Sequence, residues 1–127
     1  MRSLYRLPLA VAFLAGLAPL ALAAAPANVG NTAIGKVLVN AKGMTLYEFA
    51  KDANGKSACN GPCAQKWPPL LDNGGTASGN WSVITRADGS KQWAYKGHPL
   101  YTWVGDSKPG QTTGNGFLNG AWTVARP

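Results

Sequence analysis

Cys59 and Cys63 are the two cysteines of this 127-residue sequence, and their C-x3-C spacing around a Gly-Pro pair permits two kinds of chemistry. In an oxidising compartment they would form a disulfide, and closing so short a loop is worth about 2 kcal/mol of stability. As thiolates they could instead join the imidazole of His98 and the thioether of Met44 in a soft ligand set that suits copper. We interpret the pair as a disulfide, with a periplasmic copper-binding or thiol-redox site as the alternative.

The carboxylates offer one pair for acid–base catalysis, Asp52 and Asp106. A hydrolase would need these two side chains close together in a cleft. Neither aspartate is followed by the Thr/Ser-Gly of aspartic-protease loops, and a serine nucleophile elbow, a phosphate-binding loop and a zinc-protease helix are all missing from the sequence. We therefore expect no enzyme activity and no cofactor, and we keep a hydrolase as a further alternative.

A motif that reads G-x-x-L-Y-x-[FW]-x-x-D occurs at positions 43–52 and again at positions 97–106. The two copies align from the first glycine to the last aspartate without a gap, and a later tryptophan also recurs, as Trp67 and Trp122. This agreement indicates an internal duplication. The motif residues that could form a binding site are Tyr47, Phe49, Asp52, Tyr101, Trp103 and Asp106.

The motif has a structural and a functional interpretation. In a strand, Tyr47 and Phe49 would point to one face, and Leu46 and Glu48 to the other. An aspartate placed shortly after the aromatic residue can accept backbone N–H bonds in the following turn. The main interpretation is that the aromatic residues are core and the aspartates lock turns. The alternative is that both sets line a groove between the two halves.

These motifs resemble a family of secreted or lipoprotein repeats of unknown function, which is defined by Y-x-[FWY]-x-x-D. The resemblance also includes the segment from Cys59 to Leu70 and Pro109-Gly110 before Trp122, and it covers nearly all of the chain beyond the predicted signal peptide. Many members look like lipoproteins, but this sequence has no cysteine near the predicted cleavage site, so membrane anchoring is not carried over. The resemblance implies no established activity.

Glycine, asparagine, threonine and aromatic residues predict an all-β fold of short strands joined by turns. The clearest strand signals are at residues 36–39, 45–49, 81–85, 92–95, 100–103 and 121–124. A helical turn is expected at 62–67, before Pro68-Pro69, and a flexible connector at 72–79. We expect one small domain at 35–127, preceded by an N-terminal extension at 24–34. Its two similar antiparallel halves, about 35–71 and 81–127, would form a meander or a sandwich.

The N-terminal segment, 1–23, is predicted to be a cleavable secretory signal peptide. Arg2 and Arg6 precede an apolar stretch, and Ala21-Leu22-Ala23 matches the A-x-A cleavage pattern. We expect a soluble mature chain, periplasmic or extracellular, without a transmembrane segment.

The full chain has a formal net charge of +7, and losing Arg2 and Arg6 would leave ten basic and five acidic residues, a net charge of +5. The basic residues are scattered singly, which disfavours nucleic acid as a partner. An anionic polymer of the cell envelope, or another envelope protein, fits the charge better. The sequence therefore predicts an exported, non-catalytic binding or structural module of the envelope.

Overall fold

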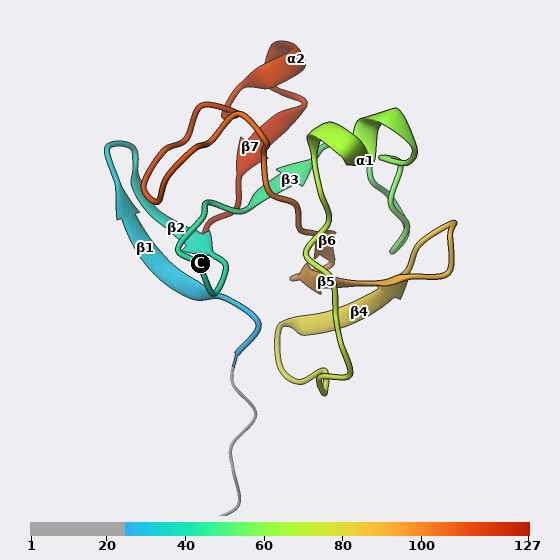
Figure 1. The fold of residues 1–127 in the computed structure, drawn as a ribbon. Coiled ribbons are helices and arrows are strands. Elements are labelled where there is room, and N and C mark those ends of the chain that lie inside the picture. The colour runs from blue at the N-terminus through green and yellow to red at the C-terminus, as the bar shows by residue number, and fades with distance from the viewer. Residues whose placement is uncertain (1–24) are drawn as a thin grey trace, which may run out of the picture.

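The structure is a computed structural model that describes residues 25–127 (Figure 1). The predicted signal peptide, residues 1–23, lies outside the described residues. In chain order the elements are β1 (Asn28–Thr32), β2 (Gly35–Val39), β3 (Tyr47–Phe49), α1 (Pro62–Lys66), β4 (Trp81–Thr85), β5 (Lys91–Tyr95), β6 (His98–Pro99), α2 (Phe117–Gly120) and β7 (Trp122–Val124). Strands dominate, and the two helices have only five and four residues, which confirms the predicted all-β class.

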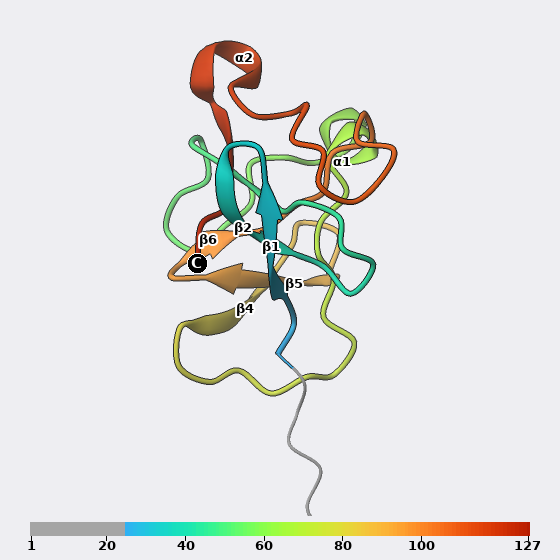
Figure 2. The same cartoon turned by 90° about the vertical axis from the view of Figure 1, so that its left-hand side faces the viewer.

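The strands form three small antiparallel sheets. β1 pairs with β2, β3 pairs with β7, and β4, β5 and β6 form a three-stranded sheet in that order. The β1–β2 hairpin and the three-stranded sheet lie on different sides of the molecule (Figure 1). Turning the molecule by 90° shows that α1 and α2 share one end of it, away from β4 (Figure 2).

The structure differs from the predicted elements at α2, for which no helix is predicted, and at two further places. β1 lies in the stretch that we assigned to an N-terminal extension, and it pairs with β2 along its whole length. Its sequence, NVGNT, has no alternating apolar pattern, because this outer strand is largely exposed. The strand predicted at 100–103 is replaced by β6 and by isolated bridges from Tyr101 to Tyr47 and to Pro69.

The last segment of the second half completes the first half. Leu38 donates its backbone N–H to Ala125 O at 2.9 Å, and Ala125 in turn donates to Leu46 O at 2.8 Å. Leu46 N–H donates in turn to Leu38 O at 2.9 Å, so the three residues are linked in a ring of backbone hydrogen bonds. β7 continues this contact by pairing with β3, with Tyr47 opposite Val124.

The last segment of the first half completes the second half in the same way. Trp93 donates to Leu70 O at 2.9 Å, Leu70 donates to Leu100 O at 2.9 Å, and Leu100 donates to Trp93 O at 3.1 Å. The bridge between Tyr101 and Pro69 matches the pairing of Tyr47 with Val124. The two halves are therefore interlocked, each closed by the end of the other.

Two clusters of buried side chains fill the space between these segments. The alternation predicted for the first motif holds, because Tyr47 and Phe49 belong to one cluster and Leu46 to the other. The larger cluster comprises Val37, Val39, Tyr47, Phe49, Cys59, Trp67, Tyr101, Trp122 and Val124. The smaller cluster comprises Ala27, Leu38, Leu46, Leu100 and Ala125. Both clusters draw residues from both halves, so neither half has a core of its own.

Candidate functional site

The tyrosine of the first motif is bonded to the aspartate of the second. Tyr47 donates its hydroxyl hydrogen to Asp106 Oδ2 at 2.6 Å, and both side chains are buried. The other carboxylate oxygen, Oδ1, accepts from the backbone N–H and the hydroxyl of Thr113, at 2.9 and 2.6 Å. Gly114 N–H donates to the Tyr47 hydroxyl at 3.2 Å, so this group both gives and receives a bond. Asp106 thus locks its own turn and binds the opposite half.

The tyrosine of the second motif makes the reciprocal bond. Tyr101 donates to Asp52 Oδ2 at 2.6 Å, while Asp52 Oδ1 accepts the backbone N–H of Ala58 at 2.7 Å. The two tyrosines also exchange backbone bonds, from Tyr47 N–H to Tyr101 O at 2.7 Å and from Tyr101 N–H to Tyr47 O at 3.0 Å. We call the two Tyr–Asp pairs the cross-braces. Each carboxylate also accepts a backbone N–H of its own turn, so Asp52 and Asp106 are bonded in separate turns.

Burial sets the protonation of the cross-braces. It raises the pKa of both phenols, Tyr47 and Tyr101, well above the ordinary value of 10, and the hydrogen bond to an aspartate raises it further. Burial also raises the pKa of Asp52, against the opposing effects of the Ala58 N–H and the Tyr101 hydroxyl. The phenols therefore remain donors over the physiological range, which is what a structural brace needs.

The remaining motif residues, Phe49 and Trp103, lie at the two ends of an aromatic stack. Its centre is the parallel pair Trp67 and Trp122, with ring centroids 3.8 Å apart and planes within 1° of each other. Phe49 stacks on Trp122 at 4.1 Å, and Trp103 stacks on Trp67 at 4.2 Å. Each tyrosine meets the tryptophan of its own half edge-on, Tyr47 with Trp67 and Tyr101 with Trp122, while the stacked pairs cross between the halves. The motif side chains are thus used to hold the halves together.

A second repeated motif, which our sequence analysis missed, supplies the central tryptophans. It reads N-G-x5-W and occurs at positions 60–67 and again at positions 115–122. α1 and α2 occupy the same place in the two copies. Aligning the halves at the tryptophans rather than at the tyrosines would have revealed it, because one inserted residue separates the two registers.

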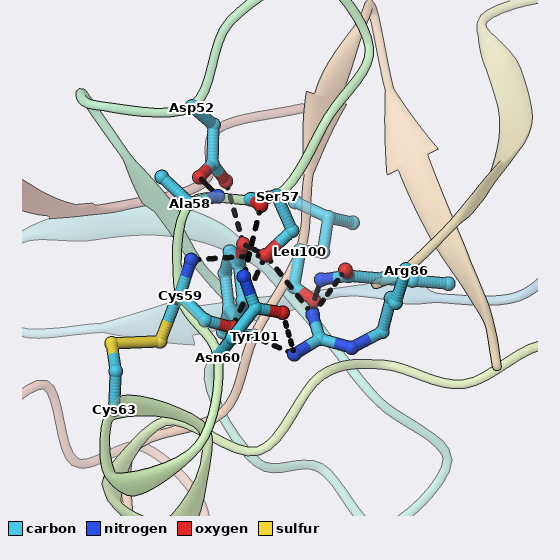
Figure 3. The surroundings of a disulfide bond; sticks show 10 residues. Asp52, Ser57, Ala58, Cys59, Asn60, Cys63, Arg86, Leu100 and Tyr101 are labelled. Carbon is cyan, nitrogen blue, oxygen red and sulfur yellow. Dashed lines mark hydrogen bonds between the residues drawn. A yellow bond between two sulfur atoms is a disulfide. The ribbon is translucent and has the colours of Figure 1, made fainter. Parts of the chain in front are cut away.

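The structure pairs Cys59 with Cys63 in a disulfide of 2.04 Å, next to the side chain of Arg86 (Figure 3). His98 lies elsewhere, on β6, with Nδ1 3.7 Å from Glu48 Oε1. Met44 lies in the turn before β3, where its backbone N–H donates to Asn40 Oδ1. Across residues 25–127, no three His, Cys, Asp or Glu side chains are grouped so that they could hold a metal ion. The copper ligand set of our alternative interpretation is therefore not assembled in this structure.

Reducing the disulfide is expected to lower the free energy of unfolding by about 2 kcal/mol and to leave the fold intact. The corresponding segment of the second half has Gly114 and Leu118 in place of the two cysteines, and it forms the short element α2 without a disulfide. Urea unfolding followed by circular dichroism, with and without reductant, measures the difference. The double variant Cys59→Ser/Cys63→Ser is the control, and reductant should not change its midpoint. Complete unfolding on reduction would contradict this expectation.

Two of the grooves on the described part of the surface, residues 25–127, are lined by aromatic or acidic motif residues. An apolar groove of about 270 Å³ opens between α1 and α2, beside the aromatic stack. Its lining residues are Phe49, Pro62, Cys63, Lys66, Trp67, Phe117, Leu118 and Trp122. A wider, charged groove of about 510 Å³ contains the Glu48–His98 pair. The remaining residues of its lining are Lys96, Asn115, Thr123, Val124 and Arg126.

Comparison with known proteins identifies the repeat. Within the described part of the chain, no helix is long and apolar enough to cross a membrane. No curated protein and no solved structure matches the chain. One family matches, described as a secreted repeat of unknown function, and it matches twice, at residues 28–71 and 82–126. The first match begins at β1, in agreement with the pairing of β1 and β2. The chain belongs to this family of secreted repeats, of which it contains two interlocked copies.

Proposed function

We propose that this protein is an exported, non-catalytic module of the cell envelope that binds an anionic polymer. The observation that carries the proposal is that the basic side chains are exposed, whereas most acidic side chains are hydrogen-bonded within the protein. All eight lysines are exposed, and so is Arg126. The lysines are Lys36, Lys42, Lys51, Lys56, Lys66, Lys91, Lys96 and Lys108.

The acidic side chains are largely occupied by internal bonds. Asp52 and Asp106 serve the cross-braces. Asp72 accepts the backbone N–H of Gly75 at 2.7 Å, and Asp88 binds the N–H and the hydroxyl of Ser90. Glu48 faces His98. Within residues 25–127, the eight exposed lysines and Arg126 therefore outnumber the exposed carboxylates, of which Asp88 is the one fully exposed.

The motif chemistry supports a role without catalysis. Both motif tyrosines and both motif aspartates are bonded to one another across the two halves. A rigid, interlocked frame with scattered lysines suits many weak contacts to a repeating anionic chain. Such contacts are screened by salt, because they lie at the surface.

The test uses the chain without its predicted signal peptide and two immobilised polymers of similar length, polygalacturonate and neutral dextran. Binding to polygalacturonate is expected at low ionic strength and should weaken by about tenfold between 50 and 300 mM NaCl. No binding to dextran is expected under either condition. Equal binding to both polymers, or salt-independent binding, would refute the proposal.

A further inference from the structure

Arg86 is the one basic side chain that is buried among residues 25–127, with an exposed fraction of 5%. It directly follows β4, and its guanidinium points toward the segment next to the disulfide (Figure 3). Nη1 donates to Gln92 Oε1 at 2.7 Å and to Ser57 Oγ at 3.1 Å. Nη2 donates to Cys59 O at 2.6 Å and to Asn60 Oδ1 at 3.4 Å. All four acceptors are neutral.

The charge of Arg86 therefore lacks a directly bonded counter-charge. In the described part of the chain, the one ion pair within 4.0 Å is between His98 and Glu48. The hydrogen-bonded route from Arg86 to Asp52 runs through two hydroxyls, those of Ser57 and Tyr101. Asp88, which also feels the field of Arg86, is fully exposed and bonded to Ser90. A buried cation in such surroundings is costly unless an anion approaches it.

Arg86 lines a hollow of about 310 Å³ that has the composition of an anion site. The other lining residues are Lys56, Ser57, Thr85 and Ala87, so two cations and two hydroxyl groups meet without a carboxylate. Lys91 adds a third cation at the rim, where Nζ donates to Thr85 Oγ1 at 2.7 Å. Both Nη groups of Arg86 already donate to protein acceptors, so the Lys56 ammonium, the Arg86 Nε–H and the Thr85 hydroxyl are the donors that would bind an oxyanion here through charge-assisted bonds.

We infer that this hollow, the Arg86 hollow, binds a single oxyanion, a carboxylate or a phosphate group. In naming a group of the anionic polymer as the natural ligand, the inference rests on the proposed function. The scattered lysines would supply general attraction, and the Arg86 hollow would hold one group in a defined place. The same chemistry would also accept a free small anion.

The test is an NMR titration of the chain without its predicted signal peptide, with inorganic phosphate and separately with acetate. Ionic strength is held constant with NaCl. Saturable shifts are expected for the backbone amides of Ser57, Thr85 and Ala87 and for the side-chain Nε–H of Arg86. Shifts that are linear in concentration, or spread evenly over the exposed lysines, would overturn the inference.

Variants at exposed positions keep the test independent of folding. Lys56→Gln should weaken the anion's binding by about fivefold, because it removes one cation from the lining. Lys36→Gln removes an exposed lysine on β2 and should leave the binding unchanged. Equal effects of the two variants would overturn the inference.

The polymer provides the second arm of the test. If the Arg86 hollow holds a polymer group, Lys56→Gln should weaken polygalacturonate binding more than Lys36→Gln does. Saturable phosphate binding without any polymer binding would refute the proposed function and support the hollow as a small-anion site. Polymer binding with no saturable small-anion binding would refute the hollow and leave the proposed function standing.

Discussion

Replacing Trp122 with alanine is expected to lower the free energy of unfolding by about 3–5 kcal/mol. Trp122 is completely buried, and it is sandwiched between Phe49 and Trp67 with Tyr101 against it edge-on. Its removal would leave a cavity at the centre of the stack and would remove ring contacts with residues of both halves. Because a domain of this size has a total stability of about 5–15 kcal/mol, the variant should be only marginally folded.

Phe117→Ala is the matched control for this prediction. Phe117 touches the same stack, at 5.9 Å from the Trp67 ring, but 44% of it is exposed. We expect a loss of about 1 kcal/mol or less at this position. Urea unfolding followed by far-ultraviolet circular dichroism measures both variants without relying on tryptophan fluorescence. Losses of similar size in the two variants would contradict a central role for the stack.

Alkaline pH is expected to destabilise the protein steeply through Tyr47 and Tyr101. Burial raises the pKa of both phenols in the folded state above the ordinary value of 10. Above pH 10 the unfolded chain therefore releases protons that the folded chain retains. The folded state binds more protons, so stability falls as pH rises, by about 1.4 kcal/mol per pH unit for each tyrosine. The two together should contribute about 2.8 kcal/mol per pH unit, and below this window they contribute no slope.

Two variants separate this effect from the titration of other groups. Tyr101→Phe removes one of the two phenols and should reduce the tyrosine contribution to the slope by half. Tyr95→Phe removes a half-buried tyrosine of β5 that binds neither motif aspartate, and it should keep the full slope. Urea unfolding midpoints at pH 9, 10, 11 and 12 give the slopes. Equal slopes in the two variants would contradict the assignment to the cross-braces.

Local patterns in the sequence are sufficient to predict the structural elements that depend on residues close together in the chain. The motif aspartates are predicted to lock turns, and both do so, Asp52 through Ala58 N–H and Asp106 through Thr113 N–H. The helical turn before Pro68 is predicted because proline stops a helix, and α1 ends at Lys66. Alternation along the first motif places Tyr47 and Leu46 on different sides of β3.

Those patterns cannot predict that the tyrosine of each motif bonds to the aspartate of the other half. A sequence repeat states that two segments are alike, but it does not say whether Tyr47 meets Asp52 of its own half or Asp106 of the other. That choice depends on long-range packing, in which Trp67 and Trp122 stack face to face. The burial of Arg86 also depends on long-range packing, so from the sequence alone Arg86 looks like any other of the scattered basic residues. Its burial follows from Gln92 and the Cys59 carbonyl, which come from different parts of the chain.

The structure also changes what the motif says about function. The motif tyrosines and aspartates, which could have served acid–base chemistry, are instead bonded to each other between the two halves. In the binding role that we propose, recognition would depend on residues outside the motif. Arg86, Lys56 and Thr85 lie in the second half or in the turn between β3 and α1, and none of them belongs to the repeated Y-x-[FW]-x-x-D pattern.

A double-mutant cycle on the cross-braces tests the central claim, that each motif tyrosine is bonded to the aspartate of the other half. The free energy of unfolding is measured for Tyr47→Phe, Asp106→Asn, Asp52→Asn and the two double variants that contain Tyr47→Phe. We expect a coupling free energy of about 1–2 kcal/mol between Tyr47 and Asp106, and a coupling below about 0.5 kcal/mol between Tyr47 and Asp52. The reverse order, with the larger coupling inside one half, would contradict the interlocked structure.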